Sequence, residues 1–522
     1  MQKLLSVARL GIQNVQHFDI EKSFGRHPLF GSSVGVRIFI SLLLLNIAAY
    51  FLFVSQHPIY NHGFRFPWVA DNLGVGHGRW FNLVLRYITN SADIYAFVPL
   101  FAIFMNVSAG LMTVKIWKLK LSSIEKFLIV GLITTYPAFL TFYYFSWTTI
   151  LFMSGVFFAI MAIYFCRQLN LLGILSGGFL VLIMMASYQP SISVYATVAA
   201  GAAIAGLISR DNIPIIDVVK TLIARVFSAG IGLGAYLATV RLSGINTYTT
   251  DTVKLADVPK RILKVIDISI QQLFITQPDL LAPMKMWLLI LLVLAVFVSV
   301  FRVRKSIVKI ALVLGLWFGM LIVTKTMYML SPNVSYFEYR YNTSLAFFHT
   351  FTAAILIYGL RVPLIRSAAI LFISFILIRF VQADLIRQEV LLRGQQHDLA
   401  FANRLLVRME SLPEIDFSRR YDLIRVGGYP KYRETIFKAK GHNWEKAGDY
   451  HLDDARITSY WADEDIFILL GSKIQFQHRG YDPNFRKKSN EVKATLLEDR
   501  KPWPHETSVF ISGDKLIVYL EQ

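Results

Sequence analysis

The chain has 522 residues, of which 55% are hydrophobic and only 17% are charged, a far more apolar balance than that of average soluble domains. This composition excludes an ordinary soluble protein and predicts a membrane protein. The formal net charge of +19 would indicate nucleic acid binding in a soluble chain. Here much of the Lys and Arg flanks apolar stretches, so we expect membrane topology, anionic lipids and substrate phosphates to account for it, and no nucleic acid partner.

We expect no cleaved signal peptide at the N-terminus, because the first clear apolar stretch begins only near Ile38. Residues 1–34 are predicted to be a cytoplasmic or interfacial amphipathic segment. The apolar residues of its first half recur at helical spacing, which favours a helix lying on the membrane surface. The single cysteine, Cys166, excludes an intramolecular disulfide and a cysteine-based metal site.

Apolar stretches recur through residues 35–381, separated by short polar segments with Arg, Lys, Pro and Gly. We therefore expect a polytopic α-helical membrane protein with about eleven transmembrane helices. The predicted spans are 38–54, 94–114, 127–144, 149–165, 171–186, 192–208, 222–240, 286–301, 307–323, 343–360 and 368–381.

The distribution of Lys and Arg predicts the topology. With a cytoplasmic N-terminus, every short loop rich in Lys and Arg lies inside, as the positive-inside rule requires. The same assignment places three longer segments outside, at about 55–93, 241–285 and 325–342, and it places everything after 382 outside as well.

Residues 382–522 differ in composition from the rest, because Asp and Glu are well represented there. We expect an extracytoplasmic α/β or α+β domain of about 140 residues, large enough to have its own core. A helix is predicted near 383–411, and strands are predicted at 422–426, 466–470 and 515–520.

Candidate chemistry concentrates in the first outer segment, which contains Trp68, Asp71, His77, Arg79 and Trp80. A carboxylate can take the proton of a hydroxyl group, a guanidinium can neutralise a phosphate, and an indole can stack on a sugar face. Ionisable groups at a membrane are costly, so their clustering here predicts a site.

Asp71 is the preferred general base, with a helix cap or a pairing with Arg79 as the alternative structural role. Asp93 is a possible second acid, but its place just before a span is typical of an N-cap. The histidines of this segment lack the spacing of a helical ligand pair, so we predict no metal site and expect His77 to bind substrate or to lie at the interface.

Two further passages are expected to reach the same outer region. The turn 187–190 joins two spans and offers Tyr188 and Gln189 for substrate binding, although it also fits a plain turn with an aromatic belt residue. Glu338 is another possible second acid and Arg340 a possible ligand of a donor phosphate, unless the two simply pair with each other.

Lys325 and Arg241 are weaker candidates for phosphate binding. Each stands at the end of a span, and cations at span ends often only extend toward the interface.

The order of these passages resembles the GT-C superfamily of membrane glycosyltransferases, in which the catalytic acid lies in the first outer loop. More narrowly, the chain resembles the serotype-converting O-antigen glucosyltransferases of bacteria and their phages, the type II Gtr-like family. The passages that carry the likeness are Asp71 with 78–80, the turn 187–190, and the tail 502–509 leading to 513–520.

The resemblance implies a GT-C-like catalytic domain over 35–381 in the bacterial inner membrane, with the domain at 382–522 in the periplasm. It implies a polyprenyl-phosphate glucose donor, made by a separate synthase and delivered by a flippase. The implied acceptor is lipid-linked O-antigen or a related surface polysaccharide. Family members often have two adjacent acids where this chain has Ala70 and Asp71, so a divalent metal is left open but is not implied.

The expected mechanism is a single inverting displacement, with Asp71 as the base and with Arg79 and Arg340 stabilising the departing phosphate. One alternative is a transporter or flippase of lipid-linked glycans, although the sequence shows no inverted repeat. Another is a membrane acyltransferase that modifies the same polysaccharide, which would need a histidine deeper in the membrane half, where only His349 stands.

Overall fold

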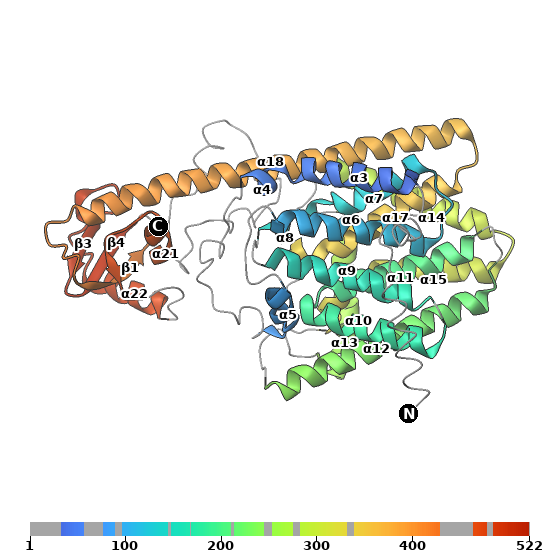
Figure 1. Ribbon diagram of the computed structural model, residues 1–522, viewed down its shortest axis with the longest axis horizontal. Helices are drawn as coiled ribbons and strands as arrows, with labels where there is room; N and C mark the ends of the chain where they lie inside the picture. The colour runs from blue at the N-terminus through green and yellow to red at the C-terminus, as the bar shows by residue number, and fades with distance from the viewer. Residues whose placement is uncertain are drawn as a thin grey trace, which may run out of the picture.

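The computed structural model of the 522-residue chain describes residues 33–56, 77–88, 97–144, 148–167, 169–209, 213–244, 253–274, 282–330, 339–428, 463–477 and 484–520. The helices form a bundle, a small β-sheet lies at a distance from it, and one long helix, α18, runs from the bundle to the sheet (Figure 1). The predicted segment 1–34 lies outside the described residues except for its last two positions.

Each apolar span predicted before position 245 corresponds to one or more helices in the structure. Their bounds are α3 Ser33–Ala49, α4 Phe51–Ser55, α5 Phe81–Ile88, α6 Phe97–Trp117, α7 Ser123–Thr134, the 3₁₀ helix η3 Pro137–Phe139, α8 Leu140–Tyr143, α9 Thr149–Phe165, α10 Leu171–Ser187, α11 Ser191–Ile208 and α12 Ile215–Leu242. The helix α5 lies within the first outer segment, for which no helix was predicted.

The helices after position 250 complete the bundle. Their bounds are the 3₁₀ helix η5 Leu255–Asp257, α13 Val258–Phe274, α14 Ala282–Val303, α15 Ile307–Val323, α16 Thr326–Leu330, the 3₁₀ helix η6 Tyr339–Asn342, α17 Thr343–Gly359 and α18 Pro363–Glu410. The second outer segment therefore also contains a helix, the amphipathic α13.

Two of the predicted spans are broken helices. Between α7 and η3 the chain bends by 43°, because Pro137 cannot donate the backbone hydrogen bond that would continue the helix. A second break separates α3 from α4 at Tyr50, whose φ of −109° and ψ of 27° are not helical.

Length and composition allow four of the described helices to cross a membrane, or five if the bent pair counts as one span. These are α6, α11, α14 from Met284 onward, and α18, with the pair formed by α7 and the segment Pro137–Tyr143; five shorter apolar helices accompany them. The bundle is compatible with a polytopic membrane protein, and the expected number of crossings stays a prediction.

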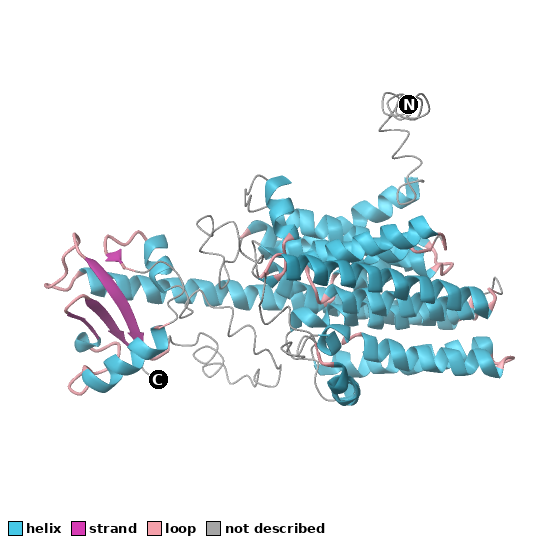
Figure 2. Cartoon of the chain, turned by 90° about the horizontal axis from the view of Figure 1, so that it is seen from below, coloured by secondary structure: helices cyan, strands magenta, loops and turns pink. Residues whose placement is uncertain are grey.

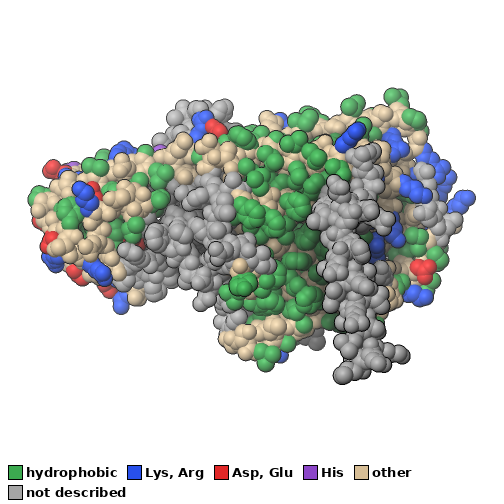
Figure 3. All heavy atoms as spheres, in the orientation of Figure 1, with side chains coloured by type: hydrophobic (Ala, Val, Ile, Leu, Met, Phe, Trp, Pro, Cys, Tyr) green, Lys and Arg blue, Asp and Glu red, His purple; other side chains and the backbone are tan. Residues whose placement is uncertain are grey.

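The bundle buries its central helices and exposes apolar side chains on its outside. Almost every residue of α17 is buried, whereas Phe297 of α14 and Phe318 of α15 are more than half exposed. Figure 3 shows apolar side chains covering much of the visible side of the bundle, with Lys and Arg gathered at the end away from the sheet. Exposed rings on helices this apolar fit a hydrocarbon environment better than water.

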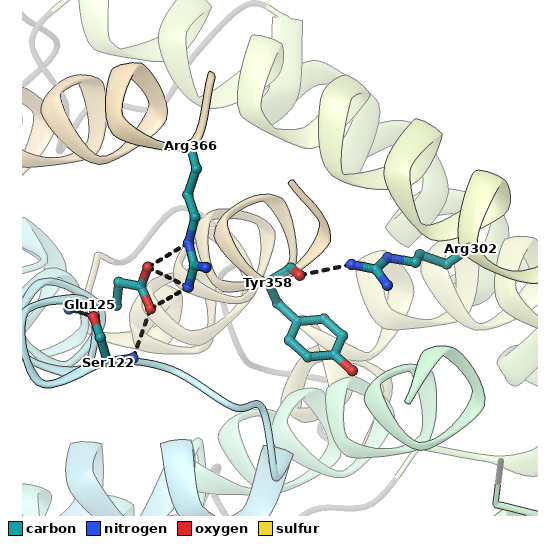
Figure 4. Close-up of polar contacts among 5 residues, drawn as sticks. All are labelled: Ser122, Glu125, Arg302, Tyr358 and Arg366. Atoms are coloured by element: carbon teal, nitrogen blue, oxygen red, sulfur yellow. Dashed lines mark hydrogen bonds and ion pairs between the residues drawn. The ribbon is translucent and has the colours of Figure 1, made fainter. Parts of the chain in front are cut away.

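Two arginines bind polar groups at the end of the bundle away from the sheet, where α18 begins (Figure 1); Figure 4 shows their contacts. The guanidinium of Arg366, at the start of α18, donates from Nε and Nη2 to the two carboxylate oxygens of Glu125, both at 2.8 Å. Glu125 also accepts from the backbone N–H of Ser122 in a capping box at the start of α7. Arg302 of α14 donates to the carbonyl oxygens of Tyr358 and Gly359, at the C-terminal end of α17, where a cation complements the helix dipole.

Helix α18 continues for 48 residues, through position 382, where the two predicted domains meet. At 1.5 Å per residue it is roughly 70 Å long, more than twice the thickness of a bilayer core. Its second half therefore projects from the bundle, as Figure 2 also shows. The predicted helix at 383–411 is confirmed as the second half of α18.

The sheet has the order β2-β1-β4-β3, built from β1 Arg420–Val426, β2 Gln475–Phe476, β3 Val509–Ser512 and β4 Lys515–Tyr519. β1 pairs in parallel with β2 and β4, while β3 and β4 form an antiparallel hairpin. Its turn contains Gly513, whose φ of 65° favours glycine. The strands predicted at 422–426 and 515–520 are confirmed.

Helices cover both faces of the sheet. On one face, Phe401, Leu405 and Met409 of α18 pack against residues such as Leu516. On the other face, α22 Phe485–Thr495 contributes Val492 to a smaller core. The short 3₁₀ helix η8 Glu506–Ser508 leads into β3.

The strand predicted at 466–470 is wrong, because this stretch belongs to the helix α21 Asp463–Leu469. The helix begins with three acidic residues, 463–465, whose negative charges are stabilised by the positive end of the helix dipole. Gly471, with a φ of 82°, stands just after its C-terminal end. Over so short a range, the apolar residues fit the period of a strand and the period of a helix equally well. The acidic residues before this stretch and the glycine after it favour the helix.

Candidate active site

Four predicted site residues lie outside the described residues: Trp68, Asp71, Asp93 and Glu338. For Arg340, the structure describes the backbone, which belongs to η6, but not the side chain. The predicted site residues with described side chains are His77, Arg79, Trp80, Tyr188 and Gln189.

The structure brings two of the predicted passages together. Arg79, just before α5, donates from Nε to the side-chain oxygen Oε1 of Gln189 at 3.2 Å. The amide nitrogen Nε2 of Gln189 donates in turn to the backbone oxygen of His77 at 2.7 Å. A single buried amide thus joins the end of the first outer segment to the turn between α10 and α11, at the end of the bundle that faces the sheet (Figure 1).

Aromatic rings surround the guanidinium of Arg79. Its Cζ atom lies 5.3 Å from the ring centroid of Phe152 and 5.6 Å from that of Tyr188. The two rings are themselves in contact, with centroids 4.4 Å apart. Cation–π contacts of this kind hold a cation in place without neutralising its charge.

The turn that presents Tyr188 and Gln189 follows from local sequence. Tyr188 takes an extended conformation after α10, and Pro190 restarts the chain at the N-cap position of α11 with a φ of −59°. Gly155 of α9 makes room for Tyr188, because a Cβ atom there would stand 2.7 Å from the Cβ atom of Tyr188.

On the other side of the site, Gly78 turns the chain immediately before Arg79. Its φ of 74° lies in the left-handed region, which glycine adopts without steric cost. Gly78 thus forms the turn that leads into α5.

Helix α12 contributes two residues that sequence reasoning missed. The hydroxyl of Tyr236 accepts a hydrogen bond from Nε2 of Gln189 at 2.9 Å. Thr239, three residues further on, accepts from Nε1 of Trp80 at 3.2 Å. Their spacing puts both on one helix face, but nothing in the sequence says that this face meets Trp80.

A second cation lies beside the first turns of α11. Lys325, only 4% exposed, donates from Nζ to Oδ1 of Asn342 in η6. Two residues later, the backbone N–H of Met327 donates to the hydroxyl of Ser193 at 3.1 Å. Ser193 stands one helical turn after Gln189, so the segment that carries Lys325 contacts the same helix end as Arg79.

The arrangement suits binding of an anionic group with apolar surroundings. A planar guanidinium recognises phosphate through paired hydrogen bonds, and the helix end adds a favourable dipole. Among the described residues, no group of three His, Cys, Asp or Glu side chains is placed to hold a metal ion.

These features define an apolar helical protein with a cationic and aromatic site at one end of its bundle. The family model for glucosyl transferase GtrII matches residues 69–353, more than half of the chain and a range that contains Arg79, Gln189 and Lys325. The chain belongs to this glucosyl transferase family, and the resemblance to the type II Gtr-like family is confirmed. Comparisons with curated proteins and with solved structures gave no match.

Proposed function

We propose that this protein transfers glucose from a polyprenyl-phosphate donor to O-antigen, or to a related surface polysaccharide, on the periplasmic face of the bacterial inner membrane. Its membership of a glucosyl transferase family supports the reaction type. The observation that carries the proposal further is the position of Arg79, held by Gln189 between two aromatic rings at one end of an apolar bundle. A lipid-linked phosphate needs a cation for its phosphate group and an apolar surface for its lipid chain.

The proposed orientation has a cytoplasmic N-terminus, about eleven crossings and a periplasmic domain at 382–522. The Lys and Arg residues at the bundle end away from the sheet support it. With this orientation, Arg79 and the sheet lie on the same, periplasmic side. Such a GT-C-like plan gives a donor lipid access from the outer leaflet.

In the proposed mechanism, Asp71 accepts the proton of the acceptor hydroxyl as its oxygen attacks the anomeric carbon of glucose. The new glycosidic bond forms while the bond from that carbon to the phosphate oxygen breaks, and polyprenyl phosphate leaves with the bonding electrons. Arg79 and Arg340 stabilise the charge on the departing phosphate. A one-step displacement of this kind inverts the anomeric configuration.

The remaining candidates for substrate binding differ in how exposed their side chains are. His77 and Trp80 are partly exposed and suit contact with the sugar, as does the predicted Trp68. Tyr188 and Gln189 are buried against Arg79, so we assign them to positioning the guanidinium. Asp93 and Glu338 are the alternative acids.

The proposal includes two partners that act before this protein. A separate enzyme must make the polyprenyl-phosphate glucose, and a flippase must present it on the periplasmic side. The sheet domain, which α18 holds away from the bundle, would help to hold the acceptor glycan.

A transfer assay tests the proposal. Purified protein in lipid nanodiscs is given labelled polyprenyl-phosphate glucose and a lipid-linked glycan acceptor, and label in the glycan is measured. Asp71→Asn should lower transfer by about 10²–10⁴-fold, the usual contribution of a general base, and Asp93→Asn, measured beside it, tests the alternative acid. Near-normal transfer by Asp71→Asn would remove Asp71 from the mechanism, and no transfer by the wild type would contradict the function.

A further inference from the structure

A second polar cluster lies at the same end of the bundle, and the proposed mechanism does not use it. Asp384 of α18 is completely buried, and neither of its carboxylate oxygens has a hydrogen-bond partner among the described residues. Arg387, one turn along, acts on it electrostatically, but no hydrogen bond joins the two side chains. A carboxyl group buried in this way costs stability.

A second unsatisfied group lies close to Asp384. The hydroxyl of Tyr143, at the end of α8, is also buried without a hydrogen-bond partner in the described part of the chain. Tyr143 stacks on Tyr50, and the preceding residue Ala49 accepts a hydrogen bond from Gln388, one turn from Asp384 on α18. The Tyr50 hydroxyl, by contrast, is satisfied, because it donates to the carbonyl of Thr134 at 2.7 Å.

Aromatic rings line the same place. The ring of Tyr143 stacks on that of Tyr50, with centroids 4.5 Å apart, and lies 5.7 Å from that of Phe53. Phe53 also approaches Tyr144, at 5.9 Å. Acceptor oxygens and a hydroxyl beside aromatic faces are the groups with which proteins bind carbohydrate, since sugar hydroxyls hydrogen-bond to the polar atoms and the C–H face of the ring packs on the aromatics.

The cluster is connected to the start of the first outer segment. Gln388, one turn after Asp384, accepts from the backbone N–H groups of Leu52 and Phe53 in α4 and donates to the carbonyl of Ala49. It thereby fixes the break between α3 and α4, and α4 leads in sequence to Asp71. Figure 1 shows α4 lying along α18 at the end of the bundle nearest the sheet.

We propose that Asp384 and Tyr143 form a sugar subsite, in which the carboxyl group of Asp384 hydrogen-bonds to hydroxyls of a pyranose ring and the Tyr143 hydroxyl bonds to another hydroxyl of the same ring. This inference rests on the proposed function and adds two residues to it. The pyranose belongs either to the glucosyl group of the donor or to the acceptor glycan. The cluster is closed here, so a sugar enters when α4, five residues long and separated from α3 at Tyr50, moves aside.

The subsite predicts an unusual combination of effects. A structural carboxyl group stabilises the protein, so its removal lowers the melting temperature. A carboxyl group kept for a ligand costs stability in the free protein, so Asp384→Asn should leave the melting temperature unchanged or raise it while weakening substrate binding.

The experiment compares the wild type with Asp384→Asn, Tyr143→Phe and the control Asp398→Asn in lipid nanodiscs. Asp398 is a second buried acid further along α18, where the helix packs on the sheet. KM is measured separately for polyprenyl-phosphate glucose and for the glycan acceptor, and melting temperatures are measured with and without donor. We expect KM for one of the two substrates to rise about tenfold in both subsite variants, because each variant loses a hydrogen bond to the sugar, and to stay unchanged in Asp398→Asn.

Each outcome decides. A rise in KM for the donor alone assigns the subsite to the transferred glucose, and a rise for the acceptor alone assigns it to the glycan. Unchanged KM values for both substrates, with or without a lower melting temperature, overturn the subsite; if Asp384→Asn does not accumulate, Tyr143→Phe decides alone. A wild type that neither transfers glucose nor is stabilised by the donor contradicts the proposed function and the subsite with it.

Discussion

The two ends of the helical bundle treat their charged side chains differently. At the end away from the sheet, Glu125 and Arg366 satisfy each other through two hydrogen bonds, and Arg302 binds helix carbonyls (Figure 4). At the end facing the sheet, Arg79 contacts an amide and two aromatic rings, and Asp384 has no hydrogen-bond partner among the described residues. The first end pairs its charged groups with one another and with helix carbonyls, whereas the second holds the groups to which we assign binding of phosphate and sugar.

Among the side chains that the structure describes, the guanidinium of Arg79 at the sheet-facing end has the largest expected effect. Arg79→Ala should lower transfer by about 10²–10³-fold, the usual loss when one electrostatic contact to the transition state is removed. Arg79→Lys should restore only part, because an ammonium cannot make the planar paired contact. The transfer assay measures both variants.

The positioning role of Gln189 gives this prediction its control. If Gln189 acts through Arg79, then Gln189→Ala should lower transfer less than Arg79→Ala does, and the double variant should be no worse than Arg79→Ala alone. Strictly additive losses would show that Gln189 contacts the substrate itself.

At the opposite end, the expected effect is on stability and not on catalysis. Arg366→Ala removes both hydrogen bonds from the guanidinium to the buried carboxylate of Glu125. Among the described residues, the backbone N–H of Ser122 still donates to this carboxylate. The loss should lower the free energy of unfolding by about 1–3 kcal/mol. Thermal unfolding of the purified variant measures the loss. Transfer per folded molecule should equal that of the wild type, and a matching loss of transfer would break the proposed contrast between the two ends.

A smaller effect is expected from packing behind the site. Gly155→Ala places a methyl group 2.7 Å from the Cβ atom of Tyr188, and such overpacking costs about 1–3 kcal/mol. The shift of Tyr188 should also reduce transfer, because that ring holds Arg79. Gly230→Ala is the matched control, since its added Cβ meets nothing within 4 Å; equal melting temperatures and equal transfer rates of the two variants would contradict this account of the site.

The sequence predicted the helices well, because apolar stretches of this length have few alternatives in a membrane. It also predicted that the turn at 187–190 reaches the outer region, and the contact between Gln189 and Arg79 agrees with that. By contrast, Tyr236, Thr239 and Phe152 were missed, since their roles depend on which helices pack side by side.

Asp384 illustrates the limit most clearly. In the sequence it is one acid in a polar stretch after an apolar one, and such residues are ordinarily exposed. Here α18 packs on α4 and η3, which are separated from Asp384 by more than two hundred residues and lie next to the breaks at Tyr50 and Pro137. Short-range patterns carry no information on such contacts.

One measurement tests the central claim most directly: the transfer of labelled glucose from polyprenyl-phosphate glucose to a lipid-linked glycan by purified wild-type protein, with Arg79→Ala beside it. The account predicts labelled glycan with the wild type and a loss of about 10²–10³-fold with the variant. Equal labelling by both would contradict the assignment of the site, and labelled glycan with neither would contradict the proposed donor and acceptor.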